Sequence, residues 1–301
     1  MSERYERWKL RILRFVARWK LRGERYWESL RGTPLGTLIE RIINGFTAIE
    51  PFDRAMTLAA QAFVSIVPMM IVMAALRPNQ DGFGSFMADT LGLTEETREA
   101  LAGSVSTSAS LGGSIGILGL LVALISATSY SRALERMYAK VWQVRRPGLR
   151  SAWRWLTTVL AVVLAIGLIE VTREATEGVP LPALWDFVVR VVVWAVVWTY
   201  VPWALLHAQV PVRVLAFTGG VTALLLGLLS LAGQLYLPIV LVSGTRQFGV
   251  LGLVFAYIGW LFVLSFALVL ACVIGQACAQ DEGVLGRVIR GRDDSVTWQT
   301  V

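Results

Sequence analysis

Side chains that carry catalysis or bind metals are nearly missing from this chain. Its 301 residues include one histidine, His207, and two cysteines, Cys272 and Cys278. A lone histidine cannot build a zinc site of the usual kind, no Gly-x-Ser-x-Gly elbow is present, and no acids cluster as a ribonuclease would need. The cysteines share one apolar segment, so we expect packing residues and no disulfide framework. We therefore predict no cofactor, no bound metal, no catalytic residue and no enzymatic activity.

Charge is the second scarcity. Charged residues make up 16% of the chain and hydrophobic residues 55%, and the mean hydropathy is +0.61. This balance excludes a large water-soluble domain. Because a bilayer core about 30 Å thick needs roughly 20 apolar helical residues, the chain has room for several membrane spans.

Apolar stretches with few or no charges recur six times. They are residues 57–76, 111–130, 153–171, 183–206, 214–237 and 249–279. We predict an all-α fold, a polytopic membrane helical bundle of about six transmembrane helices. The expected parts are basic amphipathic cytoplasmic or interfacial helices in 1–54, the six-helix transmembrane domain in 55–280, and a cytoplasmic tail in 281–301.

The distribution of lysine and arginine predicts the orientation. Twelve basic residues precede the first span, and seven more lie from the end of the second span to the first turn of the third. The connection at 77–110 has only two, against five acids. Because short basic loops resist translocation, we expect both termini in the cytoplasm.

Two amphipathic helices are expected before the first span. In the first twenty residues, aromatic and apolar residues recur at helical spacing between basic ones. This helix can lie on an anionic cytoplasmic leaflet, or it can pack as a solvated helix on the cytoplasmic loops. Thr33 and Pro34 have the pattern of an N-cap and a first helical residue for the second helix, which we expect to be interfacial or packed against the bundle. Its apolar face is predicted to contain Leu35, Leu38, Ile39, Ile42, Phe46 and Ile49.

Polar residues inside the predicted spans are candidates for a substrate path or cavity. They are Gln61, Ser65, Pro68, Glu170, Arg190 and Gln234. Pro68 should bend the first span, and Ser65 is expected to help satisfy the carbonyl that the proline frees. Glu170 is expected near the outer membrane interface.

Arg190 needs a reason to lie inside a span, because a charged group there is costly. It can pair with Asp186 one turn away, or it can attract an anionic group and line a cavity. The amides of Gln61 and Gln234 can bridge helices or line a path. The sequence leaves these alternatives open.

A cluster of charged residues follows the second span on the predicted cytoplasmic side. Its members are Arg132, Glu135, Arg136, Arg145 and Arg146. Glu135 can form an ion pair with Arg132 that fixes the loop, or the arginines can hold lipid phosphates.

Three segments resemble the YihY/BrkB family of bacterial inner-membrane proteins, historically also labelled ribonuclease BN. They are Leu58 to Val72 with its Ser-x-x-Pro, Ala133-Leu134-Glu135 with Val141-Trp142 and Arg145-Arg146-Pro147, and Phe248-Gly249 with Gly252 before the long last helix. The likeness runs from about Asp53 to Gln280. The chain departs from the family at Ala60, Gln61, Ala139 and Gln276, where two aromatics, an asparagine and a glutamate are usual. The resemblance implies six helices, an inner-membrane location and links to envelope physiology, including lipid or small-molecule transport.

Transport fits these features better than anchoring, because several helices with polar groups at depth can enclose a path. The spans contain few carboxylates, which disfavours proton or sodium coupling. We expect a transporter or flippase of a lipid or other amphiphile, with anionic lipid headgroups as partners at the cytoplasmic face, no nucleic-acid partner, and self-association left open. An uncoupled channel and a non-transporting scaffold are the alternatives. Convergence of the polar span residues on one cavity would favour transport.

Overall fold

Every element in the described part of the chain is an α-helix. The computed structural model describes residues 33–76, 113–145, 153–175 and 182–291. The helices are α2 (Pro34–Ala48), α3 (Pro51–Leu76), α6 (Gly113–Val141), α7 (Trp153–Ala175), α8 (Pro182–Leu205), α9 (Val212–Phe248), α10 (Val250–Ala279) and α11 (Val284–Arg290). The predicted all-α class is confirmed for these residues. The amphipathic helix predicted in the first twenty residues lies outside them, as does Arg146.

Helices occupy each of the six segments predicted to span a membrane, wherever those segments are described. Within the described residues, three stretches are long and apolar enough to cross a membrane: Phe187–Leu205, Val212–Gly244 and Val254–Ala279. A shorter apolar stretch lies in α7. Six membrane passages therefore stay a prediction, while several candidate transmembrane helices are present.

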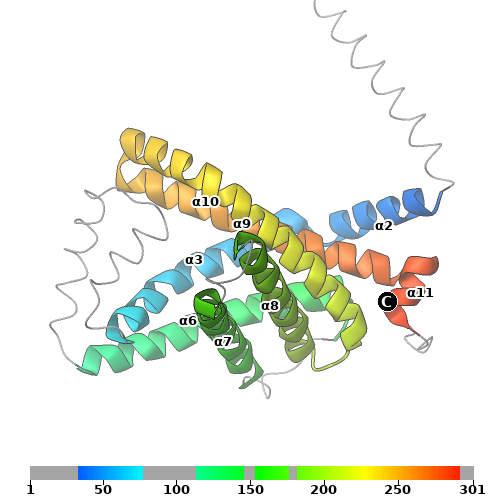
Figure 1. Ribbon diagram of the computed structural model, residues 1–301, viewed down its shortest axis with the longest axis horizontal. Coiled ribbons are helices and arrows are strands. Elements are labelled where there is room, and N and C mark those ends of the chain that lie inside the picture. The colour runs from blue at the N-terminus through cyan, green and yellow to red at the C-terminus, as the bar shows by residue number, and fades with distance from the viewer. Residues whose placement is uncertain (1–32, 77–112, 146–152, 176–181, 292–301) are drawn as a thin grey trace, which may run out of the picture.

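The helices pack mainly in antiparallel pairs (Figure 1). α9 and α10 form a long hairpin joined by Gly249, whose φ of 59° lies in the left-handed region that suits glycine. α8 packs on the other side of α9, α3 packs on both α6 and α10, and α7 packs on α8. These contacts place α9 between α8 and α10, and α10 between α9 and α3.

Small residues bring α9 close to both of its neighbours. A Cβ on Gly219 would lie 2.8 Å from the carbonyl oxygen of Ala195 in α8. A Cβ on Gly275 of α10 would overlap the side chain of Thr218. Near the hairpin turn, Gly252 approaches the backbone of Gly244. Without side chains at these points the helix backbones approach closely, as in many membrane bundles.

The tightest packing lies at one end of the bundle, where α6, α8 and α10 end and α3 and α9 begin. The fully buried side chains there include Leu58, Tyr138, Trp142, Leu205, Val214 and Cys272. The predicted orientation makes this the cytoplasmic end. So many fully buried side chains in one place form a close-packed core.

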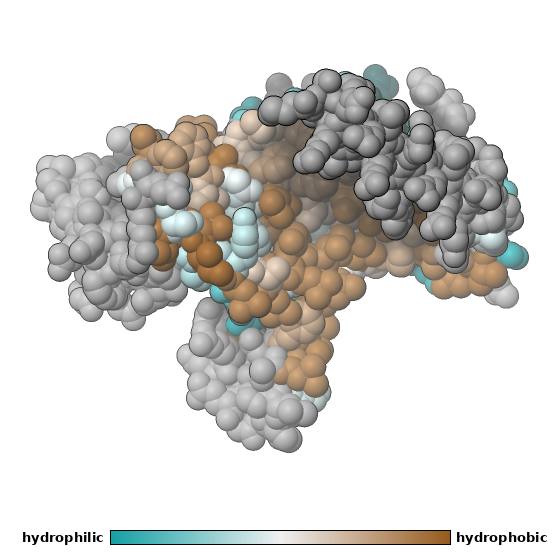
Figure 2. Space-filling view, turned by 90° about the horizontal axis from the view of Figure 1, so that it is seen from above, coloured by the Kyte–Doolittle hydropathy of each residue, from teal (hydrophilic) through white to brown (hydrophobic). Residues whose placement is uncertain are grey.

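Large apolar side chains also cover much of the outside of the bundle. In Figure 2, the described part of the visible face is mostly apolar and is interrupted in places by more hydrophilic residues. Examples at least 60% exposed are Val64, Leu164, Val196, Leu235, Ile239 and Phe255. An apolar surface of this extent is unfavourable in water and suits the hydrocarbon core of a bilayer.

Helix α2 begins as predicted and lies against the bundle. The side chain of Thr33 accepts a hydrogen bond from the backbone N–H of Gly36 at 3.2 Å, and Pro34 is the first helical residue, which confirms the predicted cap. Leu38, Ile42 and Phe46 pack against the core on the α10 side. Ile39, predicted on the same apolar face, is 39% exposed, so the buried part of this face is narrower than the apolar face itself.

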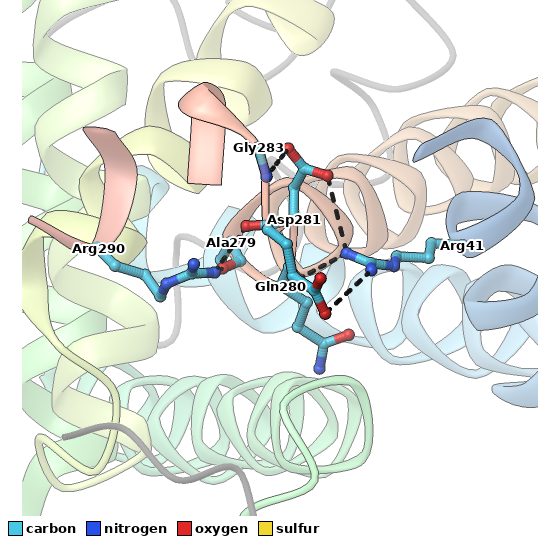
Figure 3. Close-up of polar contacts among 7 residues, drawn as sticks. Arg41, Ala279, Gln280, Asp281, Gly283 and Arg290 are labelled. Atoms are coloured by element: carbon cyan, nitrogen blue, oxygen red, sulfur yellow. Dashed lines mark hydrogen bonds and ion pairs between the residues drawn. The ribbon is translucent and has the colours of Figure 1, made fainter. Parts of the chain in front are cut away.

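Two arginines from other helices hold the carboxyl end of α10 (Figure 3). Arg290 of α11 donates to the carbonyl oxygens of Ala279 and Asp281, the latter at 2.9 Å. Arg41 of α2 donates to the carbonyl oxygen of Gln280 at 2.6 Å and lies 3.8 Å from Oδ1 of Asp281. Because the carboxyl end of a helix carries partial negative charge, both guanidinium groups stabilise it. The segment predicted as a tail thus returns to the bundle as α11.

Candidate functional site

A cavity of about 510 Å³ lies among five helices, on the side of the bundle away from the dense core. Its walls come from α3, α6, α8, α9 and α10. The lining residues are Ala62, Tyr130, Phe187, Arg190, Val191, Trp194, Trp198, Ala223, Leu226, Gly227, Ser230, Leu231, Gln234, Leu261, Leu264, Ser265 and Leu268. A volume of this size is in the range that encloses small-molecule ligands.

The cavity has a buried floor and an exposed mouth. Ala223 and Leu268 are each 2% exposed, and Ser265 is buried beside them. Ser230 and Gln234 of α9 are exposed and mark the mouth. Most of the wall is apolar or aromatic, and a few hydroxyl, amide and guanidinium groups interrupt it. An apolar wall with a few placed polar groups is typical of ligand pockets.

Two of the predicted path residues meet in this cavity. Arg190 comes from α8 and Gln234 from α9, and both line the same space. They are 44 positions apart in the sequence, and the antiparallel packing of α8 on α9 brings them together. The side chain of Asp186, the partner proposed for Arg190, lies outside the described residues.

Gln61 and Ser65 lie beside the cavity, in the contact between α3 and α6. The hydroxyl of Ser129 donates to Oε1 of Gln61 at 2.7 Å. The hydroxyl of Ser65 lies 2.8 Å from the carbonyl oxygen of Gln61 and 3.2 Å from that of Ser126. It therefore bridges the two helices instead of serving the carbonyl of Val64, which is the one that Pro68 frees. Of the two readings left open for Gln61, these contacts match the bridge between helices.

The remaining predicted path residues cannot be placed in the site. Pro68 lies within α3, and Glu170 lies within α7. Both side chains lie outside the described residues. The role of Pro68 in bending the helix and the interfacial position of Glu170 stay predictions.

The aromatic wall of the cavity was missed from the sequence. Trp194 and Trp198 stack with ring centroids 6.4 Å apart, and Tyr130 faces the same space from α6. The sequence contains a signal for this wall, because Arg190, Trp194 and Trp198 follow one another at four-residue steps and so share one face of a helix. That face points into the bundle.

Two prolines lie inside the helices that form the wall. Pro202 lies inside α8 and Pro238 inside α9. Because proline has no N–H, the carbonyl four residues earlier loses its helical donor. Those carbonyls belong to Trp198 and Gln234, and both residues line the cavity.

The predicted charge cluster lies at the dense end and is organised by a tryptophan of α7. The indole N–H of Trp155 donates to Oε2 of Glu135 at 2.7 Å, and the carboxyl residue is only 9% exposed. The guanidinium of Arg132 lies 5.3 Å from the centre of the same ring. A cation over an aromatic face is attracted to it. Trp155 thus contacts both Glu135 and Arg132.

Other cations surround this cluster. Arg154 donates to the carbonyl oxygen of Ala204 at 3.3 Å and lies 5.4 Å from the ring of Trp153. Burial lowers the pKa of His207 below its usual 6.5, and the nearby charge of Arg154 lowers that pKa further. Arg136 is partly exposed and Arg145 is exposed, while Arg146 lies outside the described residues. This end of the bundle thus carries both basic and indole side chains, which are common at membrane interfaces.

The described residues form no cluster of metal ligands. In residues 33–76, 113–145, 153–175 and 182–291, no three His, Cys, Asp or Glu side chains come close enough to hold a metal ion. Cys272 and Cys278 are free and buried.

Long apolar helices, a lipid-compatible surface and a partly polar internal cavity together define a membrane protein with several candidate transmembrane helices. The chain belongs to the Virulence factor BrkB family, whose family model matches residues 42–291. The resemblance seen in the sequence is thereby confirmed, and the match extends through α11. No curated protein and no solved structure matches the chain.

Proposed function

We propose that this protein is a transporter or flippase that moves a lipid or another amphiphile across a bacterial inner membrane, without proton or sodium coupling. The observation that carries the proposal is the cavity in which Arg190 and Gln234 meet. A passive anchor has no use for a partly polar cavity inside its bundle, and polar groups placed there are costly in a membrane.

The composition of the cavity supports an amphiphilic substrate. Its floor and walls are apolar and aromatic, which suits a hydrocarbon or ring portion. Arg190, Ser230 and Gln234 supply the groups that a polar portion needs. Among the described lining residues there is no carboxylate, the group that commonly carries protons or sodium in coupled transporters. Transport is thus also favoured over catalysis.

The arrangement in the membrane is part of the proposal. The six predicted spans would place the dense end, with Arg132 and Arg154, in the cytoplasm together with both termini. Anionic lipid headgroups are the proposed partners of those arginines, because basic residues at this face attract the charged leaflet. Reporters fused to the two termini should both act in the cytoplasm, and opposite locations would contradict this topology.

Reconstitution into liposomes tests the function. Purified protein should accelerate the loss of fluorescence when dithionite bleaches a tail-labelled phospholipid that has crossed to the outer leaflet. Gln234→Leu should slow this movement several-fold, because it removes a polar group of the cavity. Tyr236→Phe is the matched control: it removes a polar group from the same helix at a position that is 60% exposed and does not line the cavity.

The alternatives give different results in the same vesicles. Ion flux without lipid movement would indicate an uncoupled channel. Folded protein that moves neither lipids nor ions would indicate a scaffold, and the proposed function would then fail.

A further inference from the structure

Resting on the proposed function, we propose a substrate class for the cavity: an amphiphile whose anionic phosphate headgroup enters it, while its acyl chains stay in the surrounding bilayer. Three features carry this inference: the volume of the cavity, the nature of its rim, and the place of Arg190 in its wall.

The volume admits a headgroup and excludes a whole phospholipid. A cavity of about 510 Å³ encloses a ligand of small-molecule size, and a two-chain lipid is larger than this. The dense core beyond the floor offers no further room. On α8, Val197 beside Trp198 and Val201 and Leu205 beyond it are 5%, 1% and 1% exposed. The chains must therefore remain outside the mouth.

The rim gives those chains an apolar place to lie. Around the polar mouth residues Ser230 and Gln234, α9 exposes a row of leucines. Leu224, Leu228, Leu231 and Leu235 are 49%, 51%, 45% and 78% exposed. The mouth is thus a polar opening in an apolar helix surface. A channel for a hydrated ion would need a polar approach, whereas this one suits a molecule that arrives from the lipid.

The positive charge of Arg190 in the wall favours an anionic headgroup. Arg190 lies eight positions after Pro182, about 12 Å along α8 at 1.5 Å per residue, and its side chain is only partly exposed. A guanidinium presents planar, forked donors that match two oxygens of a phosphate. The described lining holds no carboxylate that would attract a cationic headgroup. The hydroxyls of Ser230 and Ser265 and the amide of Gln234 can donate to further oxygens.

Ligand binding in detergent tests this class without requiring transport. The probes are dihexanoyl phosphatidylglycerol, which is anionic, dihexanoyl phosphatidylcholine, which carries the same phosphate but no net charge, and inorganic phosphate. Apparent Kd values come from the rise in unfolding temperature with ligand concentration. We expect phosphatidylglycerol to bind about tenfold more tightly than phosphatidylcholine, because the choline cation partly offsets the attraction of the phosphate for Arg190. Inorganic phosphate should bind more weakly than either lipid.

Variants assign the effect to the cavity. Arg190→Gln should remove the preference between the two lipids, and Arg190→Lys should retain part of it. Arg287→Ala removes an exposed arginine of α11 outside the cavity and should leave the preference unchanged. If Arg190→Gln does not fold, Arg190→Lys and Gln234→Leu still test the site, because both should weaken phosphatidylglycerol binding.

Several results would overturn the inference. Equal binding of the two lipids, an unchanged preference in Arg190→Gln, or phosphate binding as tight as that of the anionic lipid would each contradict it. The liposome assay reports the proposed function separately. Lipid movement with no headgroup preference would retain the function and reject the substrate class.

Discussion

Replacing Arg290 by alanine should loosen the carboxyl end of α10 before it unfolds the rest of the bundle. The guanidinium holds the carbonyl oxygens of Ala279 and Asp281 across a turn that ends α10. Hydrogen bonds from a charged donor contribute about 1.5–3 kcal/mol each when buried. Since Arg290 is partly exposed, we take about 2 kcal/mol for the pair. Arg41 holds the same end from α2 and should keep the rest of α10 in place.

A thiol inside the affected turn makes this loss measurable. Cys278 is 5% exposed and precedes Ala279, and Cys272 is the only other cysteine of the chain. In a Cys272→Ala background, a maleimide dye can label only Cys278, and only when the turn opens. A loss of about 2 kcal/mol should raise the labelling rate about 30-fold when opening is a fast pre-equilibrium.

The control lies on the same short helix. Arg287 is exposed, and Arg287→Ala should change the labelling rate little, because surface substitutions usually stay within about 0.5 kcal/mol. Equal rates for Arg290→Ala and Arg287→Ala would refute the idea that Arg290 holds this turn. A 30-fold increase in both would assign the effect to α11 as a whole.

Three further predictions concern contacts outside the cavity. Trp155→Phe removes the donor to the buried carboxylate of Glu135 and should destabilise the protein by about 1–3 kcal/mol. The loss should appear as a lower unfolding temperature in detergent. An unchanged unfolding temperature would show that the carboxylate does not depend on the indole. Gly275→Ala should destabilise because its Cβ would overlap a threonine of α9, whereas Gly259→Ala, on the same helix and facing open space, should be neutral or slightly stabilising in the same assay. Because the pKa of His207 is lowered in the folded protein, the unfolded chain binds more protons than the folded one as the pH falls through 6.5, so the free energy of unfolding should decrease below that pH. His207→Gln should flatten this pH dependence. An unchanged pH profile in that variant would contradict the prediction.

Local sequence signals predicted the helices well because they depend on few residues at a time. Thr33 and Pro34 begin α2 as expected, since a cap needs only its own neighbours. The end of α9 was predicted too early, at about residue 237, where the apolar stretch was taken to end. The helix continues to Phe248, since one proline removes a single hydrogen bond and packing against α10 supports the rest.

The candidate site was predicted in part. Arg190 and Gln234 were identified because polar side chains inside apolar helices are conspicuous, and both line the cavity. Gln61 was equally conspicuous but bridges α3 and α6, and no local signal separates a bridging amide from a lining one. The tryptophans of the wall were overlooked because aromatic residues are common in membrane spans. Such a residue belongs to a site only when its side chain points into the cavity, and the sequence alone does not show this.

The amino-acid sequence by itself determined that this chain is a bundle of apolar helices and a member of its family, because hydrophobic length and short motifs are properties of single segments. The tertiary structure alone decided which polar residues meet in one cavity, which end of the bundle holds the dense core, and how two arginines from distant helices hold the end of α10. Those outcomes depend on the rotation and crossing of helices that lie far apart in the chain, and such angles are set by the fit of many side chains together.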